Sequence, residues 1–204
     1  MFKNIIYAIL LGIAMAACLD NRENVSEEKA TTASETSPVI PSEEIPEIDP
    51  ATFLIAKDQA GSIKIGMPVE QMRQNVPAAF TITDTILNKE GQQYTAYVLK
   101  TAGEKRSLLV EQICEPACKV WRITVLSPDF KTASGIVIGS KYDEVRQKYK
   151  INYVSPGEGI FVAVDEAAGF SFVLDKPNLP AGNPANLKPD DIPANTLVKS
   201  ILIY

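Results

Sequence analysis

Apolar residues alternate with polar ones in several short segments of the chain, and turn-forming residues bound each segment. Three such segments lie in the middle of the chain and three lie nearer the C-terminus, and all are rich in β-branched and aromatic residues. This pattern predicts strands. The predicted strands are residues 94–100, 106–113, 120–126, 160–165, 169–174 and 197–204. Because the last one reaches the final residue, its removal is expected to unfold the domain.

Two further stretches, 69–76 and 142–149, place their apolar side chains at the spacing of one helical face. Pro68 suits the first helical position, and Pro77 ends the first helix. The apolar faces are expected to lie on a sheet and not to bind a cofactor. Each helix precedes a group of strands. The sequence therefore predicts an α+β fold of two tandem helix-plus-antiparallel-sheet units, with the helices packed on one face of the sheet.

The chain also resembles itself. Residues 62–66 are similar to residues 135–139, and an amphipathic stretch follows each of them. Residues 96–99 are similar to residues 171–174. Three matches in the same order favour an internal duplication. The two repeats are predicted at about residues 60–130 and 133–204 of a globular region that spans residues 51–204.

One motif carries a resemblance to known proteins. Residues 63–73 have the sequence Ile-x-Ile-Gly-Met-Pro-x-Glu-x-Met-Arg, which resembles the Ile-x-x-Gly-Met-Thr-x-x-x-Val-Arg motif of the small barrel-assembly lipoprotein family. The tandem arrangement is similar to that of the β-lactamase inhibitor protein fold. The second copy departs from the motif, because it has Ser140 in place of Met. Members of that superfamily are mainly binding or scaffold proteins, so the resemblance implies a function of that kind.

Residues 1–17 predict an export signal. Lys3 supplies a positive charge, and the uncharged apolar run from residue 5 to residue 17 is shorter than the roughly 20 residues of a membrane-spanning helix. The run ends in Met15-Ala16-Ala17-Cys18, which resembles the lipobox of bacterial lipoproteins. The resemblance implies that Cys18 becomes the mature N-terminus and carries the lipid anchor, with palmitate-type chains. The alternative is a plain secretory signal in which Cys18 is incidental.

The segment after Cys18 predicts a tether. Residues 19–50 contain nine acidic and two basic residues and no aromatic residue, a composition that keeps a chain disordered. We expect residues 18–50 to be a lipidated cysteine and an acidic linker that holds the domain off the membrane. An interaction tail is the alternative. Leu19, in place of Asp, implies the outer membrane by the sorting rule of enteric bacteria.

The chain contains no histidine, which excludes Ser-His and Cys-His nucleophilic pairs and the commonest metal ligand. We predict no catalytic, cofactor or metal site. Catalysis by carboxylates alone would need a pair such as Asp165 with Glu166 or Asp190 with Asp191. Neighbouring acids in turns are usually solvated. An enzyme is therefore not expected, and a carboxylate-dependent envelope hydrolase is the alternative.

Cys114 and Cys118 stand between two predicted strands. In an oxidising compartment they are expected to form a disulfide that closes the hairpin. A redox dithiol and a metal site are the rival interpretations. Residues 176–195 form the second unusual segment, with five prolines. This loop is interpreted as a rigid surface connection, and the alternative is a binding edge for a partner.

Together these patterns predict a lipid-anchored lipoprotein of the bacterial cell envelope, in the outer membrane, with a non-enzymatic binding or scaffold domain. Its partner, an envelope protein of unknown identity, would meet the sheet face or the proline-rich loop. A purely structural lipoprotein is a further possibility. Residues 51–204 are close to electrically neutral, so no nucleic-acid partner is expected.

Overall fold

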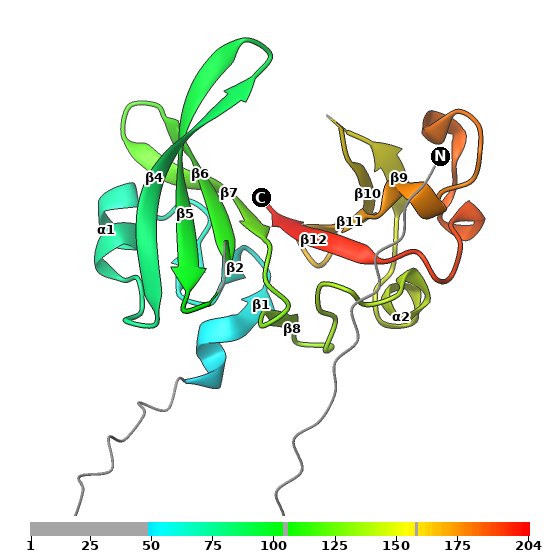
Figure 1. Ribbon diagram of the computed structural model, residues 1–204, viewed down its shortest axis with the longest axis horizontal. Helices are drawn as coiled ribbons and strands as arrows, with labels where there is room; N and C mark the ends of the chain where they lie inside the picture. The colour runs from blue at the N-terminus through cyan, green and yellow to red at the C-terminus, as the bar shows by residue number, and fades with distance from the viewer. Residues whose placement is uncertain (1–48, 104–105, 158) are drawn as a thin grey trace, which may run out of the picture. The chain divides into compact units, whose positions relative to one another are not determined.

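The computed structural model describes residues 49–103, 106–157 and 159–204 (Figure 1). The predicted signal peptide (1–17), Cys18 and the linker as far as Ile48 lie outside the described residues. None of the helices in the described ranges has the length and apolar character needed to cross a membrane.

A large eight-stranded sheet has the strand order β4-β5-β6-β7-β12-β11-β10-β9, and all neighbouring strands in it are antiparallel. The first four strands form one meander and the last four form another. Pairing of β7 with β12 joins the two meanders. The strands are β4 (Phe80–Lys89), β5 (Gln92–Thr101), β6 (Leu108–Cys114), β7 (Cys118–Val125), β9 (Tyr153–Pro156), β10 (Phe161–Asp165), β11 (Phe170–Leu174) and β12 (Val198–Ile203).

A second sheet is small and has the order β3-β2-β1-β8. Its strands are β1 (Leu54–Ala56), β2 (Gln59–Ala60), β3 (Ile63–Lys64) and β8 (Lys131–Thr132). The described α-helices are α1 (Val69–Gln74) and α2 (Tyr142–Lys148). Four 3-10 helices complete the elements: η1 (Pro50–Phe53), η2 (Lys176–Asn178), η3 (Pro184–Asn186) and η4 (Pro189–Asp191).

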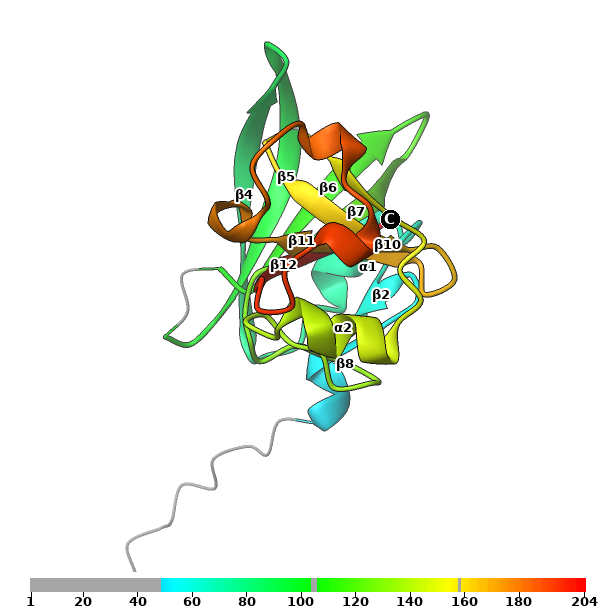
Figure 2. The same cartoon turned by 90° about the vertical axis from the view of Figure 1, so that its right-hand side faces the viewer.

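The main core lies on one face of the large sheet. Every second residue of a strand points to the same face, and in β5 these are Tyr97 and Leu99, which are buried. Met72 of α1 and Val145 of α2 are fully buried in the same cluster, and so is Ile55 of the small sheet. The helices and the small sheet therefore cover this face (Figure 2).

The predicted α+β class is wrong, because the described chain is mostly β. The helical patterns at 69–76 and 142–149 form helices of only six and seven residues, which is less than two full turns. Strands are the commonest regular structure of the described chain, and β4, β9, β1, β2 and β8 were not predicted; residues 63–65 were expected to be a short strand or extended, and β3 lies there. The two meanders also share a single sheet and do not form separate helix-plus-sheet layers.

The two halves make matching backbone contacts. In each half a turn glycine donates a hydrogen bond to the fourth strand of its meander, and that strand donates one to the residue after the glycine. The N–O distances are 2.8 Å for Gly66–Val120, 2.8 Å for Val120–Met67, 2.8 Å for Gly139–Val198 and 2.9 Å for Val198–Ser140. Both glycines have positive φ, 78° and 91°, a conformation that favours glycine. By contrast, residues 96–99 lie in β5, the second strand of the first meander, and residues 171–174 lie in β11, the third strand of the second meander in chain order. These two similar segments therefore do not occupy equivalent positions in the two halves.

Candidate functional site

The face of the large sheet that points away from the helices also carries buried apolar residues, in β5, β10 and β11. Four buried apolar residues alternate with core residues along their strands and are not part of the main core: Ala96, Val98, Val164 and Val173. We call this the second face. Tyr94 and Tyr153 lie on this face, and Tyr204 follows the last residue of β12. These three tyrosines are 41%, 45% and 48% exposed. Aromatic residues are enriched at protein interfaces, so these exposed tyrosines favour a binding surface on this face.

A cleft opens at one end of the first meander, where two hairpins separate. Pairing between β5 and β6 stops at Ala96 and Glu111, although both strands continue beyond these residues. A space of about 600 Å³ lies between the β4–β5 hairpin and the β6–β7 hairpin. Its lining includes Tyr94, Ile113 and Trp121, which are 41%, 48% and 46% exposed. We call this space the hairpin cleft.

A β-bulge places Trp121 in the lining of the cleft. Glu111 pairs with Arg122 and Gln112 pairs with Val120, so Trp121 is an extra residue in β7. Val120 and its neighbour beyond the bulge, Ile123, are both buried in the core. The indole is therefore not needed to fill the core and lies half-exposed at the surface. A bulge commonly redirects a side chain in this way.

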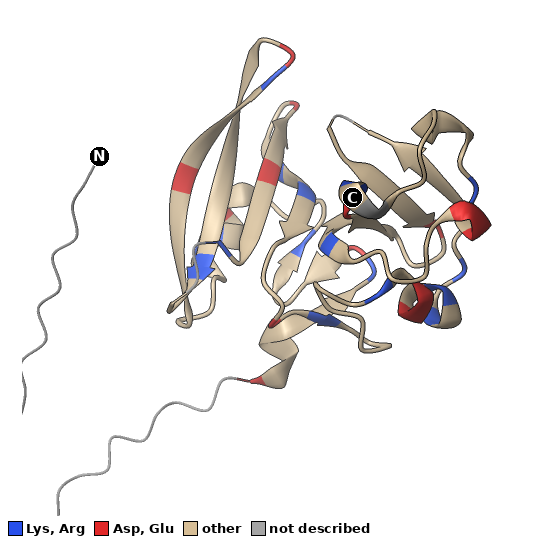
Figure 3. Ribbon diagram, turned by 45° about the vertical axis from the view of Figure 1, so that its right-hand side comes forward, with Lys and Arg blue, Asp and Glu red and all other residues tan. Residues whose placement is uncertain are grey.

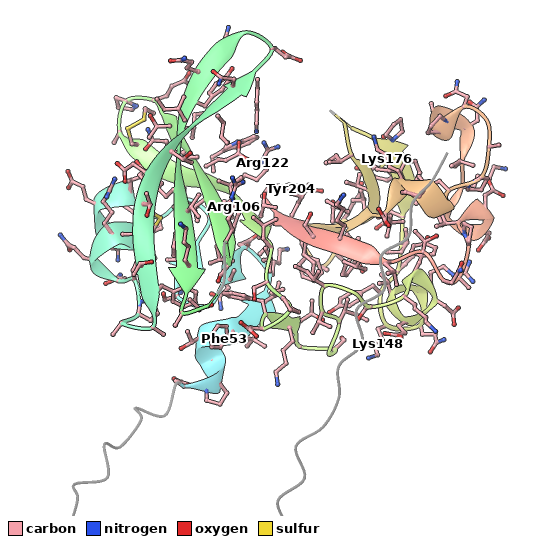
Figure 4. All side chains as sticks on the ribbon, in the orientation of Figure 1. Phe53, Arg106, Arg122, Lys148, Lys176 and Tyr204 are labelled. Atoms are coloured by element: carbon pink, nitrogen blue, oxygen red, sulfur yellow. A yellow bond between two sulfur atoms is a disulfide. The ribbon has the colours of Figure 1, made fainter. Side chains whose placement is uncertain are left out.

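A charge cluster of three side chains also lines the cleft. Arg122, labelled in Figure 4, lies opposite Glu111 in the neighbouring strand. Its Nε donates to Oε1 of Glu111 at 2.7 Å and its Nη2 donates to Oε2 at 2.8 Å. Lys89 Nζ, from the β4–β5 hairpin, donates to the same Oε2. Both oxygens of the Glu111 carboxylate thus have partners, and the cluster ties the two hairpins together.

The surroundings of Glu111 keep it ionised. Burial alone would raise the pKa of this carboxyl, but the hydrogen bonds and charges of Arg122 and Lys89 outweigh burial and lower the pKa below its ordinary value. A carboxylate with a lowered pKa is a poor general acid at neutral pH. The arrangement therefore supports a structural role for Glu111 beneath the aromatic residues.

Replacing Glu111 with Gln should destabilise the protein in a pH-dependent way. Because the folded-state pKa is lower than the unfolded value of about 4.3, the ionised carboxylate stabilises the fold above that value, and this stabilisation disappears as the pH falls through the folded-state pKa. We expect Glu111→Gln to lower the free energy of unfolding by about 1–3 kcal/mol near pH 7, and by much less near pH 3. Urea titrations at pH 7, 5 and 3 measure this difference, and a pH-independent difference would contradict the assignment.

The exposed ion pair between Arg73 and Asp84 supplies a matched control. Its side chains are 39% and 60% exposed, and pairs of this kind contribute about 0–1 kcal/mol. Asp84→Asn should therefore change stability less than Glu111→Gln at neutral pH.

Cys114 and Cys118 are joined in a disulfide that closes the β6–β7 hairpin, and Cys114 also lines the cleft. A loop this short is expected to contribute about 2 kcal/mol to stability. The Cys114→Ser, Cys118→Ser double variant should therefore unfold at lower denaturant concentration but remain cooperative. Guanidinium titration tests this. An unchanged midpoint, or loss of the folded state, would show that the disulfide has a different role.

Three of the four acidic residues considered as catalytic pairs, Asp165, Asp190 and Asp191, have separate partners. Asp165 is buried and accepts backbone hydrogen bonds from Lys150 and Ala168, at 3.0 Å each. Asp190 Oδ1 accepts a hydrogen bond from Arg146 Nη1 at 2.9 Å, and Asp191 accepts one from the backbone of its own turn. Within the part of the chain that the structure describes, no group of three or more Cys, Asp or Glu side chains is placed to hold a metal ion.

The proline-rich loop 176–195 contacts the first two residues of α2. Tyr142 Oη donates to the carbonyl of Pro189 at 3.1 Å, and the Asp143 backbone N–H donates to the carbonyl of Ala194 at 3.0 Å. Burial raises the pKa of Tyr142 to about 12, so the phenol remains a donor at neutral pH. These contacts give the loop a structural role. Its use as a binding edge stays a prediction.

The sequence matches no protein-family model, and no curated protein is significantly similar to it. The fold has a known counterpart. It is similar to the crystal structure of the uncharacterised protein YfeY from Escherichia coli, with a TM-score of 0.53 and 16% identity, over 72% of this chain and 97% of that chain. At this identity the similarity concerns the fold alone.

The hairpin cleft is not predicted from the sequence, although the disulfide at its edge is. One signal was present. In Val120-Trp121-Arg122-Ile123 the two buried aliphatic residues are three positions apart, which breaks the strict alternation of a regular strand and indicates a bulge.

Proposed function

We propose that the protein is a lipid-anchored component of the bacterial cell envelope whose folded part binds a protein partner and catalyses no reaction. The anchor is inferred from the lipobox-like sequence that ends at Cys18, and residues 19–50 act as the tether. The observation that carries the binding function is the hairpin cleft, in which Tyr94, Ile113 and Trp121 are exposed beside a charge cluster centred on the buried Glu111.

The occupant of the cleft is an apolar side chain presented by a protein. Aromatic residues are enriched at the centres of protein interfaces, and tryptophan and tyrosine are frequent hot spots. The charged groups of the lining already satisfy one another, because Arg122 and Lys89 donate to Glu111. The remaining lining recognises shape and apolar surface. A small-molecule site usually encloses most of its ligand, whereas this cleft is bounded by the exposed ends of two hairpins.

No observation on the described residues favours the carboxylate-dependent hydrolase. Glu111, the buried acid of the cleft, is held ionised and has partners on both oxygens. The binding domain is therefore the function that this geometry supports best.

A photo-reactive amino acid at position 94 tests the proposed binding site in intact cells. We expect it to cross-link one specific envelope protein, and the same amino acid at position 131, an exposed position in β8, should not. The cross-linked protein is then purified and its binding to the full-length chain is measured. Absence of direct binding, or equal cross-linking from both positions, would refute the proposed site.

Labelling tests the anchor separately. Cells that express the wild-type chain should incorporate a palmitate analogue into it, and Cys18→Ser should abolish both the label and sedimentation with membranes. The Cys114→Ser, Cys118→Ser variant is the matched control because it keeps Cys18. Label that persists in Cys18→Ser would exclude this residue as the lipid attachment site.

A further inference from the structure

The two edges of the large sheet differ in how they are protected. β9 has four residues, includes Pro156 and contacts η3. Short length, proline and a covering segment are the usual means of blocking a sheet edge. β4 has ten residues and no proline, and among the described strands it pairs with β5 alone. Figure 2 shows β4 at one margin of the sheet. β4 is therefore the edge that is available to another strand.

The turn of the β4–β5 hairpin determines which backbone groups face outward. Glu90 and Gly91 have φ values of 51° and 77°, as in a two-residue type I′ turn. Lys89 and Gln92, which close this turn, form a pair that exchanges both backbone hydrogen bonds, and such pairs alternate along the strand. Four residues therefore direct their N–H and C=O groups away from β5: Ile82, Asp84, Ile86 and Asn88.

The side chains of β4 do not oppose pairing. Figure 3 shows one acidic segment in the middle of β4, which is Asp84. Asp84 accepts a hydrogen bond from Arg73 at 2.5 Å, and Lys89 at the end of the strand contacts Glu111. Both charged residues of β4 thus have partners in the same chain. Ile86 is 60% exposed, although β-branched apolar residues in strands usually pack against a neighbour.

We propose that β4 pairs with β4 of a second copy of this chain, antiparallel, with Ile86 opposite Ile86 of the second copy. A two-fold interface must be self-complementary. Centring the pair on Asp84 would place two carboxylates directly opposite each other, which is unfavourable. Centring it on Ile86 places Asp84 opposite Asn88, which can donate to it, and buries the exposed isoleucine against its own copy. Trp121 lies on β7, away from this interface, whereas Lys89 and Glu90 line the hairpin cleft, so the dimer would adjoin one wall of the cleft.

Sedimentation velocity of the full-length chain in mild detergent, over a concentration series, tests the dimer. We expect the wild type and Ile86→Val to dimerise. Ile86→Pro should be monomeric, because proline removes an outward-facing N–H while leaving the pairing with β5 intact. A wild type that stays monomeric at all concentrations would overturn the proposal.

Cysteine cross-linking tests the pairing register and does not depend on the proline variant being folded. In the proposed register the two copies of residue 86 have Cα atoms about 5.5 Å apart, within the range of a disulfide. Oxidised Ile86→Cys should give a chain-to-chain disulfide, identified by mass spectrometry of the linked peptide. Ile82→Cys should give none, because residue 82 would lie opposite Glu90. Equal linking at both positions, or none at residue 86, would overturn this register.

Discussion

Removal of residues 198–204 should abolish cooperative folding of the domain. β12 lies between β7 and β11 and pairs with both. Ile201 and Ile203 are fully buried in the core, and the backbone of Val198 binds the turn that precedes α2. Loss of even two buried isoleucines costs about 2–5 kcal/mol each, whereas a whole domain is stable by only about 5–15 kcal/mol.

Circular dichroism during urea titration measures this effect. The truncated chain should show no cooperative transition, and the wild type should show one. The matched control removes Tyr204 alone, which is 48% exposed and contacts Ser171 through its hydroxyl, and should unfold nearly as the wild type does. A cooperative transition in the longer truncation would show that the two meanders do not depend on β12.

Replacing Trp121 with alanine should weaken binding of the envelope partner by about 30-fold or more, which corresponds to about 2 kcal/mol. The indole is 46% exposed in the free protein, so binding would bury it. Stability should change little, because Val120 and Ile123 supply the buried side chains of this part of β7. Isothermal titration with the purified partner measures the affinity.

Two variants control the Trp121 experiment. Trp121→Phe keeps an aromatic ring and should retain part of the affinity. Leu197→Ala removes an apolar side chain that is 40% exposed but lies outside the cleft lining, and it should bind as the wild type does. Equal affinity of Trp121→Ala and wild type, with both proteins folded, would exclude the cleft as the binding site.

All six strands predicted from the sequence occur in the structure, because their alternating apolar residues form the core face of the large sheet. The two missed strands of that sheet are its edges. β4 has threonines and Asp84 in place of a continuous apolar pattern, since a strand with one neighbour buries less surface. β9 is short and ends in Pro156. The signals of an edge strand are therefore weaker than those of a central one.

The fold class failed for a different reason. Helical periodicity at 69–76 and 142–149 shows which side chains face the core, but it does not show how long the helices are. The internal duplication stays a prediction. The hydrogen bonds of Gly66 and Gly139 to the fourth strand of each meander are contacts that a duplication would preserve.

The candidate site depended on long-range structure that the sequence does not display. Tyr94, Glu111 and Trp121 come from three different strands, and the cleft exists because two hairpins separate beyond Ala96. The absence of histidine from the composition excluded catalysis by histidine pairs. The composition did not indicate which surface would form a candidate site.

The fluorescence of Trp121 gives the most direct test of the proposed binding site, because it is the chain's single tryptophan. The measurement is a titration of the full-length chain with the purified partner, chosen or prepared without tryptophan at its own interface. Burial of the indole should shift its emission to shorter wavelength and protect it from acrylamide quenching. A partner that binds with full affinity but changes neither the emission nor the quenching would contradict binding at the hairpin cleft.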